Sequence, residues 1–247
     1  MRLEGHVALV TGANRNIGRA IALELAARGC AVVVNASRSR EEAEAVAAAA
    51  RRHGVKATAL LADVGRAEEV KTLAQRALAE FGKVDVLVNN AAIRPEAPFL
   101  ELSESDWHRV LDVDLNAAFY TTKAFLPGMV AQRWGRIVNL TGMNAMQGYV
   151  ARAHVSTAKH GVWGLTKALA REFGPRGVTV NAISPGPIES ERMTDDQAHH
   201  IRSMVSRVPL GRLGTPQEVA SLCGWLASDA GAFVSGQMIG VNGAAST

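Results

Sequence analysis

The stretch Thr11-Gly12-Ala13-Asn14-Arg15-Asn16-Ile17-Gly18 directly follows the apolar run Val7-Ala8-Leu9-Val10. The run predicts a buried parallel strand, and Arg19–Ala26 after the turn predicts a helix. Backbone N–H groups in the first turn of a helix lack partners within the helix and lie at the positive end of its dipole. The turn is therefore expected to bind a phosphate without needing a basic side chain.

The two glycines of this turn have different tasks. Gly12 lets the chain turn sharply, and Gly18 lets the helix approach the strand. The spacing is T-G-x-x-x-x-x-G and differs from the usual dinucleotide fingerprint, because Asn16 replaces the middle glycine. An ordinary strand-to-helix turn has the same pattern, so other parts of the chain must distinguish the two interpretations.

Length and composition indicate one domain over residues 1–247. A chain of 247 residues can bury a full central sheet, and no linker or composition shift interrupts the alternation of strands and helices. Hydrophobic residues make up 48% of the chain, yet no apolar run reaches the length of a membrane span. No signal peptide precedes the first strand, and we expect a cytoplasmic protein without a membrane partner.

The cysteine spacing and the distribution of charge bear on whether the chain binds metal ions or nucleic acid. Cys30 and Cys223 lack the spacing of metal ligands, so neither a disulfide nor a metal site is predicted. The net charge of +4 comes from dispersed Lys and Arg residues, so we expect no nucleic-acid partner. A polyanionic small molecule accounts for the positive excess.

The second buried strand, Gly29–Asn35, ends where dinucleotide folds carry an acid that binds the adenosine ribose. Asn35 replaces that acid, Ser37 and Arg38 follow it, and Arg15 lies in the glycine turn. These donors can form a cluster for a 2′-phosphate, which favours NADP over NAD. The alternative is that both arginines are solvated surface residues.

Strands and helices continue to alternate along the chain. The expected helices are 40–53 and 67–81, and the expected strands are 56–62, 84–92, 135–140 and 178–183. This alternation predicts an α/β fold of the Rossmann type, with a doubly wound parallel sheet in three layers.

Four motifs resemble the short-chain dehydrogenase/reductase family. They are the glycine turn, Asp63-Val64, Asn89-Asn90-Ala91-Ala92 and Pro185-Gly186-Pro187-Ile188. The similarity covers the whole chain and is nearest to the branch like 3-oxoacyl-carrier-protein reductase. The resemblance implies the fold, a nicotinamide dinucleotide cofactor and oxidoreductase activity on a small molecule.

The resemblance also assigns cofactor-binding roles. Asp63 and Val64 would hold the adenine, and Ile188 with Ser190 would meet the nicotinamide amide. The complete set of expected cofactor residues is Gly12, Asn14, Arg15, Asn16, Ile17, Gly18, Asn35, Ser37, Arg38, Asp63, Val64, Asn89, Ala91, Lys159, Pro185, Gly186, Ile188 and Ser190.

The chemistry of the family needs an Asn, a Ser, a Tyr and a Lys. Tyr exchanges the carbonyl proton, Lys lowers its pKa and binds the nicotinamide ribose, Ser holds the substrate oxygen, and Asn orders a water relay. Spacing from the flanking motifs places Lys159 at the Lys position. It places Val155 at the Tyr position, Gly142 at the Ser position and Asp114 at the Asn position.

The proton donor must therefore come from elsewhere. Tyr149 precedes the helix, and His154 is next to Val155, although neighbouring helical residues point about 100° apart. Asp114 is expected either to neutralise Lys159, or to be solvated or bonded to the backbone. The candidate catalytic residues are Lys159, Asp114, Tyr149 and His154.

Three functions remain open. The first is an NADP-dependent oxidoreductase for a carbonyl or alcohol with a rebuilt acid/base group. The second is a catalytically impaired NADP-binding sensor or partner subunit, and the third is a non-redox enzyme using the same pocket. Residues 191–214 are expected to form a substrate lid, and the resemblance suggests a homotetramer through the helices around 106–129 and 153–173 and the C-terminal strand.

Overall fold

Seven parallel strands form one sheet in the computed structural model, which describes residues 2–190 and 205–246. The strand order is β3-β2-β1-β4-β5-β6-β7. Their bounds are β1 (Val7–Val10), β2 (Ala31–Ala36), β3 (Ala57–Leu61), β4 (Val86–Asn89), β5 (Gly135–Leu140), β6 (Val178–Pro185) and β7 (Met238–Val241). The predicted doubly wound, Rossmann-type sheet in a single domain is confirmed.

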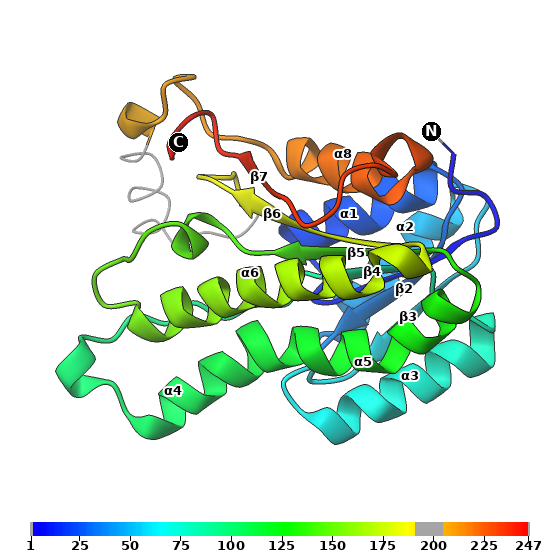
Figure 1. Ribbon diagram of the computed structural model, residues 1–247, viewed down its shortest axis with the longest axis horizontal. Helices are drawn as coiled ribbons and strands as arrows, with labels where there is room; N and C mark the ends of the chain where they lie inside the picture. The colour runs from blue at the N-terminus through cyan, green and yellow to red at the C-terminus, as the bar shows by residue number, and fades with distance from the viewer. Residues whose placement is uncertain (1, 191–204, 247) are drawn as a thin grey trace.

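Helices cover both faces of the sheet (Figure 1). One layer contains α1 (Asn16–Ala27), α2 (Arg40–Arg51) and α8 (Pro216–Ala227), and the other contains α3 (Ala67–Phe81), α4 (Glu104–Leu111), α5 (Ala117–Ala131) and α6 (Ala153–Phe173). The short helices are η1 (Phe99–Glu101), η3 (Met143–Ala145), η4 (Gly174–Arg176), η5 (Val205–Arg207) and η6 (Asp229–Gly231), and η2 (Asp112–Asn116) is one π-helical turn. A separate hydrophobic core lies under each helical layer, as expected for a sheet buried on both faces.

Element boundaries differ from the sequence prediction by a few residues. The strand expected over 84–92 ends at Asn89, because Asn90 turns its side chain to the carbonyls of Thr11 and Gly12. The strand expected over 178–183 continues to Pro185, because residues 182–185 pair with β7. The predicted lid at 191–214 lies outside the described residues over 191–204.

The carboxyl ends of the strands define one edge of the sheet, toward which the arrowheads of β5 and β6 point in Figure 1. The chain winds from β1 outward to β2 and β3, then returns to β4 on the other side of β1. Ligands of open α/β sheets bind at this reversal, beyond the carboxyl ends of the strands. None of the helices in the described part of the chain is long and apolar enough to cross a membrane.

Candidate functional site

The turn after β1 brings the helix and its neighbours so close that glycine is required. A Cβ atom on Gly18 would lie 2.3 Å from the carbonyl oxygen of Gly12, and one on Gly12 would lie 2.9 Å from Cα of Ala91. Asn16 has a positive φ of 47°, which Asn tolerates better than most residues. Asn16 can therefore replace the middle glycine.

Helix α1 begins at this turn with its backbone donors uncapped. Its N-cap is Arg15, which makes no side-chain capping bond, and the first turn contains no acidic residue. Ile17 packs against the core and holds the turn in place. The N–H groups of a first helical turn have no partners within the helix, and together with the positive end of the helix dipole they fit a phosphate or pyrophosphate.

Thr11 and Asn90 fasten β4 to the glycine turn. Thr11 Oγ1 accepts hydrogen bonds from the backbone N–H groups of Asn90 and Ala91 at 2.9 and 3.0 Å. Asn90 Nδ2 donates to the carbonyls of Thr11 and Gly12 at 2.9 and 3.0 Å. Our prediction included Ala91 but neither Thr11 nor Asn90 among the site residues, although both lie in the quoted motifs.

The residues at the end of β2 differ in burial, because Asn35 is buried whereas Ser37 and Arg38 beyond it are exposed. Asn35 is 1% exposed, and its Nδ2 donates to the carbonyls of Leu60 and Ala62 at 3.2 Å each. This amide ties β2 to the end of β3, so its donors are not free for the ribose. Ser37 and Arg38 are exposed, as is Arg15.

Two other predicted cofactor residues already have side-chain partners. Asn14 Nδ2 donates to Glu42 Oε2 at 2.6 Å. Asp63 Oδ2 pairs with Arg109 at 2.8 Å, and Asp63 Oδ1 accepts the N–H of Gly65. Val64, beside Asp63, is buried.

The segment after β6 returns to the glycine turn. A Cβ atom on Gly186 would lie 2.6 Å from Asn242, and Ile188 forms an isolated bridge with Gly214. Ser190 Oγ donates to Asn16 Oδ1 at 3.3 Å. The structure thus brings the Pro185–Ser190 segment to the turn after β1.

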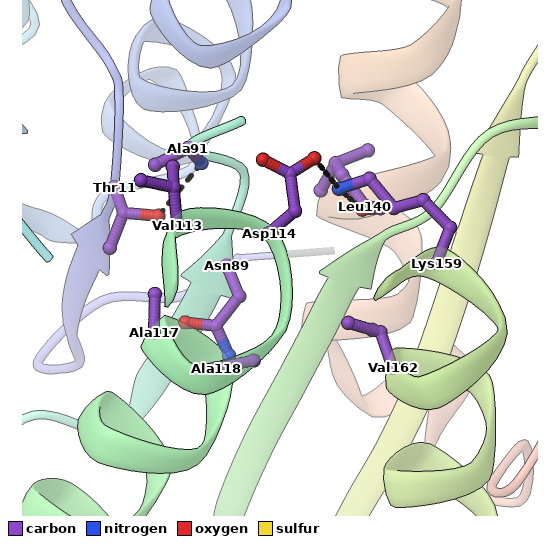
Figure 2. Close-up of a pocket in the computed structure, with 10 residues that line it drawn as sticks. All are labelled: Thr11, Asn89, Ala91, Val113, Asp114, Ala117, Ala118, Leu140, Lys159 and Val162. Atoms are coloured by element: carbon purple, nitrogen blue, oxygen red, sulfur yellow. Dashed lines mark hydrogen bonds and ion pairs between the residues drawn. The ribbon is translucent and has the colours of Figure 1, made fainter. Parts of the chain in front are cut away.

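Lys159 and Asp114 form a buried ion pair (Figure 2). Lys159 Nζ lies 3.2 Å from Asp114 Oδ2, and the two side chains are 3% and 0% exposed. Lys159 Nζ also donates to the carbonyl of Leu140 at 3.2 Å, and Asp114 Oδ1 accepts the N–H of Ile93 at 2.8 Å. Both interactions expected of Asp114, the pairing and the backbone bond, are therefore present.

The protein environment alters the acidity of Lys159. Burial lowers the pKa of its ammonium group, the carboxylate of Asp114 opposes this effect, and the positive charge of Arg94 lowers the pKa further. The net result is a pKa below the ordinary lysine value. Lys159 is therefore easier to deprotonate than a solvated lysine.

A small cavity of about 10 Å³ lies beside this pair, which is room for one water molecule. Figure 2 shows the side chains around it, which come from the turn after β1, from β4 and the residues that follow it, and from β5, α5, α6 and the π turn. Asn89 lines the cavity, but its amide is bonded to Asn139 at 2.8 Å and to the hydroxyl of Thr121 at 2.7 Å. Asn89 thus orders the interior below the pair.

The positions expected for Ser and Tyr have a different structure. Gly142 has a φ of 94° and a ψ of 172°, a region that is essentially confined to glycine. Val155 is 0% exposed and packs in a small apolar cluster with Val110 and Ala158. Neither position can provide a proton.

The two suggested replacements for the Tyr do not contact Lys159. The hydroxyl of Tyr149 accepts a hydrogen bond from Gln147 Nε2 at 2.9 Å in an exposed pair. His154 is 0% exposed, and neither of its ring nitrogens has a hydrogen-bond partner. The structure therefore unites Asp114 with Lys159 and leaves Tyr149 and His154 apart from them.

Among the described residues, no group of three or more His, Cys, Asp or Glu side chains is placed to hold a metal ion. Cys30 and Cys223 are both buried free thiols.

The chain matches a family model described as enoyl-(acyl carrier protein) reductase over residues 12–245. It is 42% identical over 237 residues to a 3-oxoacyl-[acyl-carrier-protein] reductase of Staphylococcus aureus, covering 96% of both chains. It is 43% identical to the protein of that name from Synechocystis, covering 98% of this chain and 97% of the relative. Among solved structures, one described as a short-chain alcohol dehydrogenase from Sinorhizobium meliloti has a TM-score of 0.93 and 32% identity, covering 98% of this chain and 96% of that one.

Proposed function

The chain belongs to the short-chain dehydrogenase/reductase family, and we propose that it is an NADP(H)-dependent oxidoreductase of a small carbonyl compound or alcohol. The observation that carries the proposal is the buried Asp114–Lys159 pair, 3.2 Å apart, beyond the same sheet edge as the glycine turn. It combines a lysine of lowered pKa with a place for a dinucleotide phosphate.

The residues around the turn fit a dinucleotide with a 2′-phosphate. The uncapped start of α1 would receive the pyrophosphate, and Arg15, Ser37 and Arg38 would surround the 2′-phosphate, where no acid ends β2. Both arginines are exposed. NADP(H), when bound, supplies or accepts a hydride.

Lys159 is the proton donor in this proposal. Its ammonium group gives a proton to the substrate oxygen, so that an O–H bond forms as the carbonyl is reduced. A water in the adjoining cavity would then relay a proton from bulk solvent to the neutral amine. Asp114 holds the amine in place and stabilises its charged form. Without a hydroxyl at Gly142 or Val155, turnover is expected to be slow, since each missing role is commonly worth about 10²–10⁴-fold.

The test combines cofactor titration with turnover. We expect NADPH to bind more tightly than NADH and to be oxidised slowly with ketones, as followed by absorbance. Lys159→Met should abolish this oxidation, whereas Tyr149→Phe and His154→Ala should leave it unchanged. Equal or tighter NADH binding would contradict the cofactor assignment, and loss of activity in Tyr149→Phe or His154→Ala would move the proton donor there.

A second candidate function is an NADP-binding sensor or partner subunit without turnover. It is favoured by the complete burial of Val155 and the glycine-only conformation of Gly142, which leave no hydroxyl at either position. Tight NADPH binding with no oxidation of any carbonyl compound would support it. A third candidate, a non-redox enzyme using the Asp114–Lys159 pair, predicts conversion of substrate without a change in NADPH.

A homotetramer in the cytoplasm remains part of the proposal. Strand β7 is one of the two outer strands of the sheet and exposes part of Met238, Ile239 and Val241, while Phe119 on α5 is 47% exposed. Apolar surface of this kind favours association. Light scattering at micromolar concentration should give four times the mass of one chain, and a monomer would contradict this.

A further inference from the structure

Arg94 is a cation without an ionic partner at the candidate site. It follows β4 by five residues and its residue surface is exposed, yet burial lowers the pKa of its guanidinium, an effect that the nearby carboxylate of Asp114 opposes. Among the described residues, its guanidinium makes no hydrogen bond or ion pair. The other charged groups nearby are paired, Asp114 with Lys159 and Glu96 with Arg152.

The segment that carries Arg94 is fixed at both ends. On one side, the N–H of Ile93 donates to Asp114 Oδ1 at 2.8 Å. On the other side, the N–H of Ala97 donates to the carbonyl of Ala151 at 2.9 Å, and Arg152 Nε donates to Glu96 Oε1 at 3.1 Å. Arg94 therefore lies on a braced segment between the partner of Lys159 and the start of α6.

The local charges leave one positive charge uncompensated. The Asp114–Lys159 and Glu96–Arg152 pairs each sum to zero, so the guanidinium of Arg94 determines the sign of this region. Its charge reaches the interior, because it adds to the effect of burial in lowering the pKa of Lys159. A guanidinium can bind a carboxylate through two parallel hydrogen bonds.

We propose that Arg94 binds a carboxylate on the substrate, so that the substrate is a small oxo acid or hydroxy acid. This inference rests on the proposed function, because it names the substrate class of the same site. This proposal places the carboxylate near Lys159, because Arg94 directly follows Ile93, whose N–H donates to Asp114, the partner of Lys159. A neutral ketone or ester gains nothing from Arg94.

The experiment compares acetoacetate with its neutral methyl ester on protein loaded with NADPH. Binding is followed by the change in fluorescence of the bound nucleotide. We expect the acid to bind about 10- to 100-fold more tightly than the ester, the range for a hydrogen bond to a charged group. Arg94→Gln should remove this difference, and Arg94→Lys should retain part of it.

Arg171→Gln is the matched control, because it removes the same charge from an exposed position on α6. It should leave the preference for the acid unchanged. If Arg94→Gln and Arg171→Gln weaken acetoacetate equally, or if the ester binds the wild type as well as the acid does, the inference is overturned.

NADPH binding is measured first in every variant, to separate this inference from the proposed function. A protein that binds NADPH but shows no preference for the acid overturns the carboxylate site alone. If no variant binds NADPH, the proposed function fails, and calorimetry with acetoacetate alone then tests Arg94. Binding that Arg94→Gln removes supports the site, and absence of binding overturns it.

Discussion

The turn after β1 and the end of β5 both follow buried parallel strands, but they are built in different ways. The first depends on the absence of side chains, because Gly12 and Gly18 leave no room for a Cβ atom. The second would need side chains to perform chemistry, but it has Gly142 after the strand, and Val155 on the adjoining helix α6 is fully buried. The comparison teaches that the close-packed backbone of the glycine turn is present in this chain although positions 142 and 155 carry no hydroxyl group for proton transfer.

The Asp114–Lys159 ion pair, which lies near the end of β5, gives the largest expected effect. Asp114→Asn should leave the buried ammonium of Lys159 without a counter-charge and lower the free energy of unfolding by about 3–5 kcal/mol. Urea denaturation measures the change. Asp112→Asn is the control, because that carboxylate is only half-buried on the same π turn, and it should change stability by less than about 0.5 kcal/mol. Equal losses in both variants would show that the Asp114–Lys159 pair has no special role.

The glycine turn gives the next largest expected effect. Gly18→Ala places a methyl group against backbone atoms of Gly12, which should cost about 3 kcal/mol and displace the start of α1. Titration with NADPH and thermal unfolding should both detect the change. Gly164→Ala on α6 has open space around it and should be neutral or stabilising by up to about 1 kcal/mol. Normal NADPH binding by Gly18→Ala would contradict the close approach.

Rebuilding the missing groups tests whether the two regions are independent. Gly142→Ser with Val155→Tyr returns both hydroxyls, and Asp114→Asn frees Lys159 to act on the new Tyr. We expect the triple variant to oxidise NADPH about 100-fold faster than wild type, a gain of about 2.7 kcal/mol in the barrier. Backbone strain from a serine at position 142, where φ is 94°, should separately lower the free energy of unfolding by about 1–3 kcal/mol.

The matched control for this rebuilding is Gly142→Ala with Val155→Phe and Asp114→Asn, which has similar size and no hydroxyls. It should remain as slow as wild type. Equal activity in the control would mean that packing, rather than proton transfer, limits turnover. A double variant without Asp114→Asn that matches the triple would show that Asp114 does not restrain Lys159.

Helix α8, which packs on α1 behind the glycine turn, gives the smallest effect. Hydrogen bonds from Arg212 and from the Thr215 backbone lower the pKa of Glu218 to about 2. A lowered carboxyl pKa adds stability above the ordinary value of 4.5, and this stability is lost as the pH falls toward 2. Glu218→Gln, which can still close the capping box with Thr215, should make the unfolding midpoint less dependent on pH between 5 and 2. Glu41→Gln, at an exposed position of α2, is the control. An equal loss of pH dependence in this variant would contradict the role given to Glu218.

Most of the fold could be predicted because its signals are local. The strand bounds predicted for Val7–Val10 and Gly135–Leu140 are those of the structure, and Ala67–Phe81 and Ala153–Phe173 are helices with the expected bounds. Strand ends were less predictable. The end of β4 depends on Asn90 reaching the turn after β1, and the end of β6 depends on pairing with β7.

The candidate site shows the same division. The family resemblance, together with spacing from the flanking motifs, identified Lys159, Asp114, Gly142 and Val155 as the informative positions. It left two roles open for Asp114, whereas the structure shows both the ion pair with Lys159 and the bond from Ile93. It gave no signal for Arg94, because an arginine in a loop looks solvated until its segment is seen to be tied to Asp114 and Ala151.

By itself, the sequence determined the order of strands and helices, the glycine turn and the lack of a hydroxyl at residues 142 and 155, because these depend on residue type and spacing along the chain. Only the tertiary structure decided the partners of the polar groups. The amide of Asn35 donates to the carbonyl of Leu60 in β3, and the hydroxyl of Tyr149 accepts a hydrogen bond from Gln147. The side chain of His154 is buried in the interior. The physical reason is that a hydrogen bond or ion pair needs two groups within about 3 Å, and which distant segments meet at that distance is a property of the folded chain.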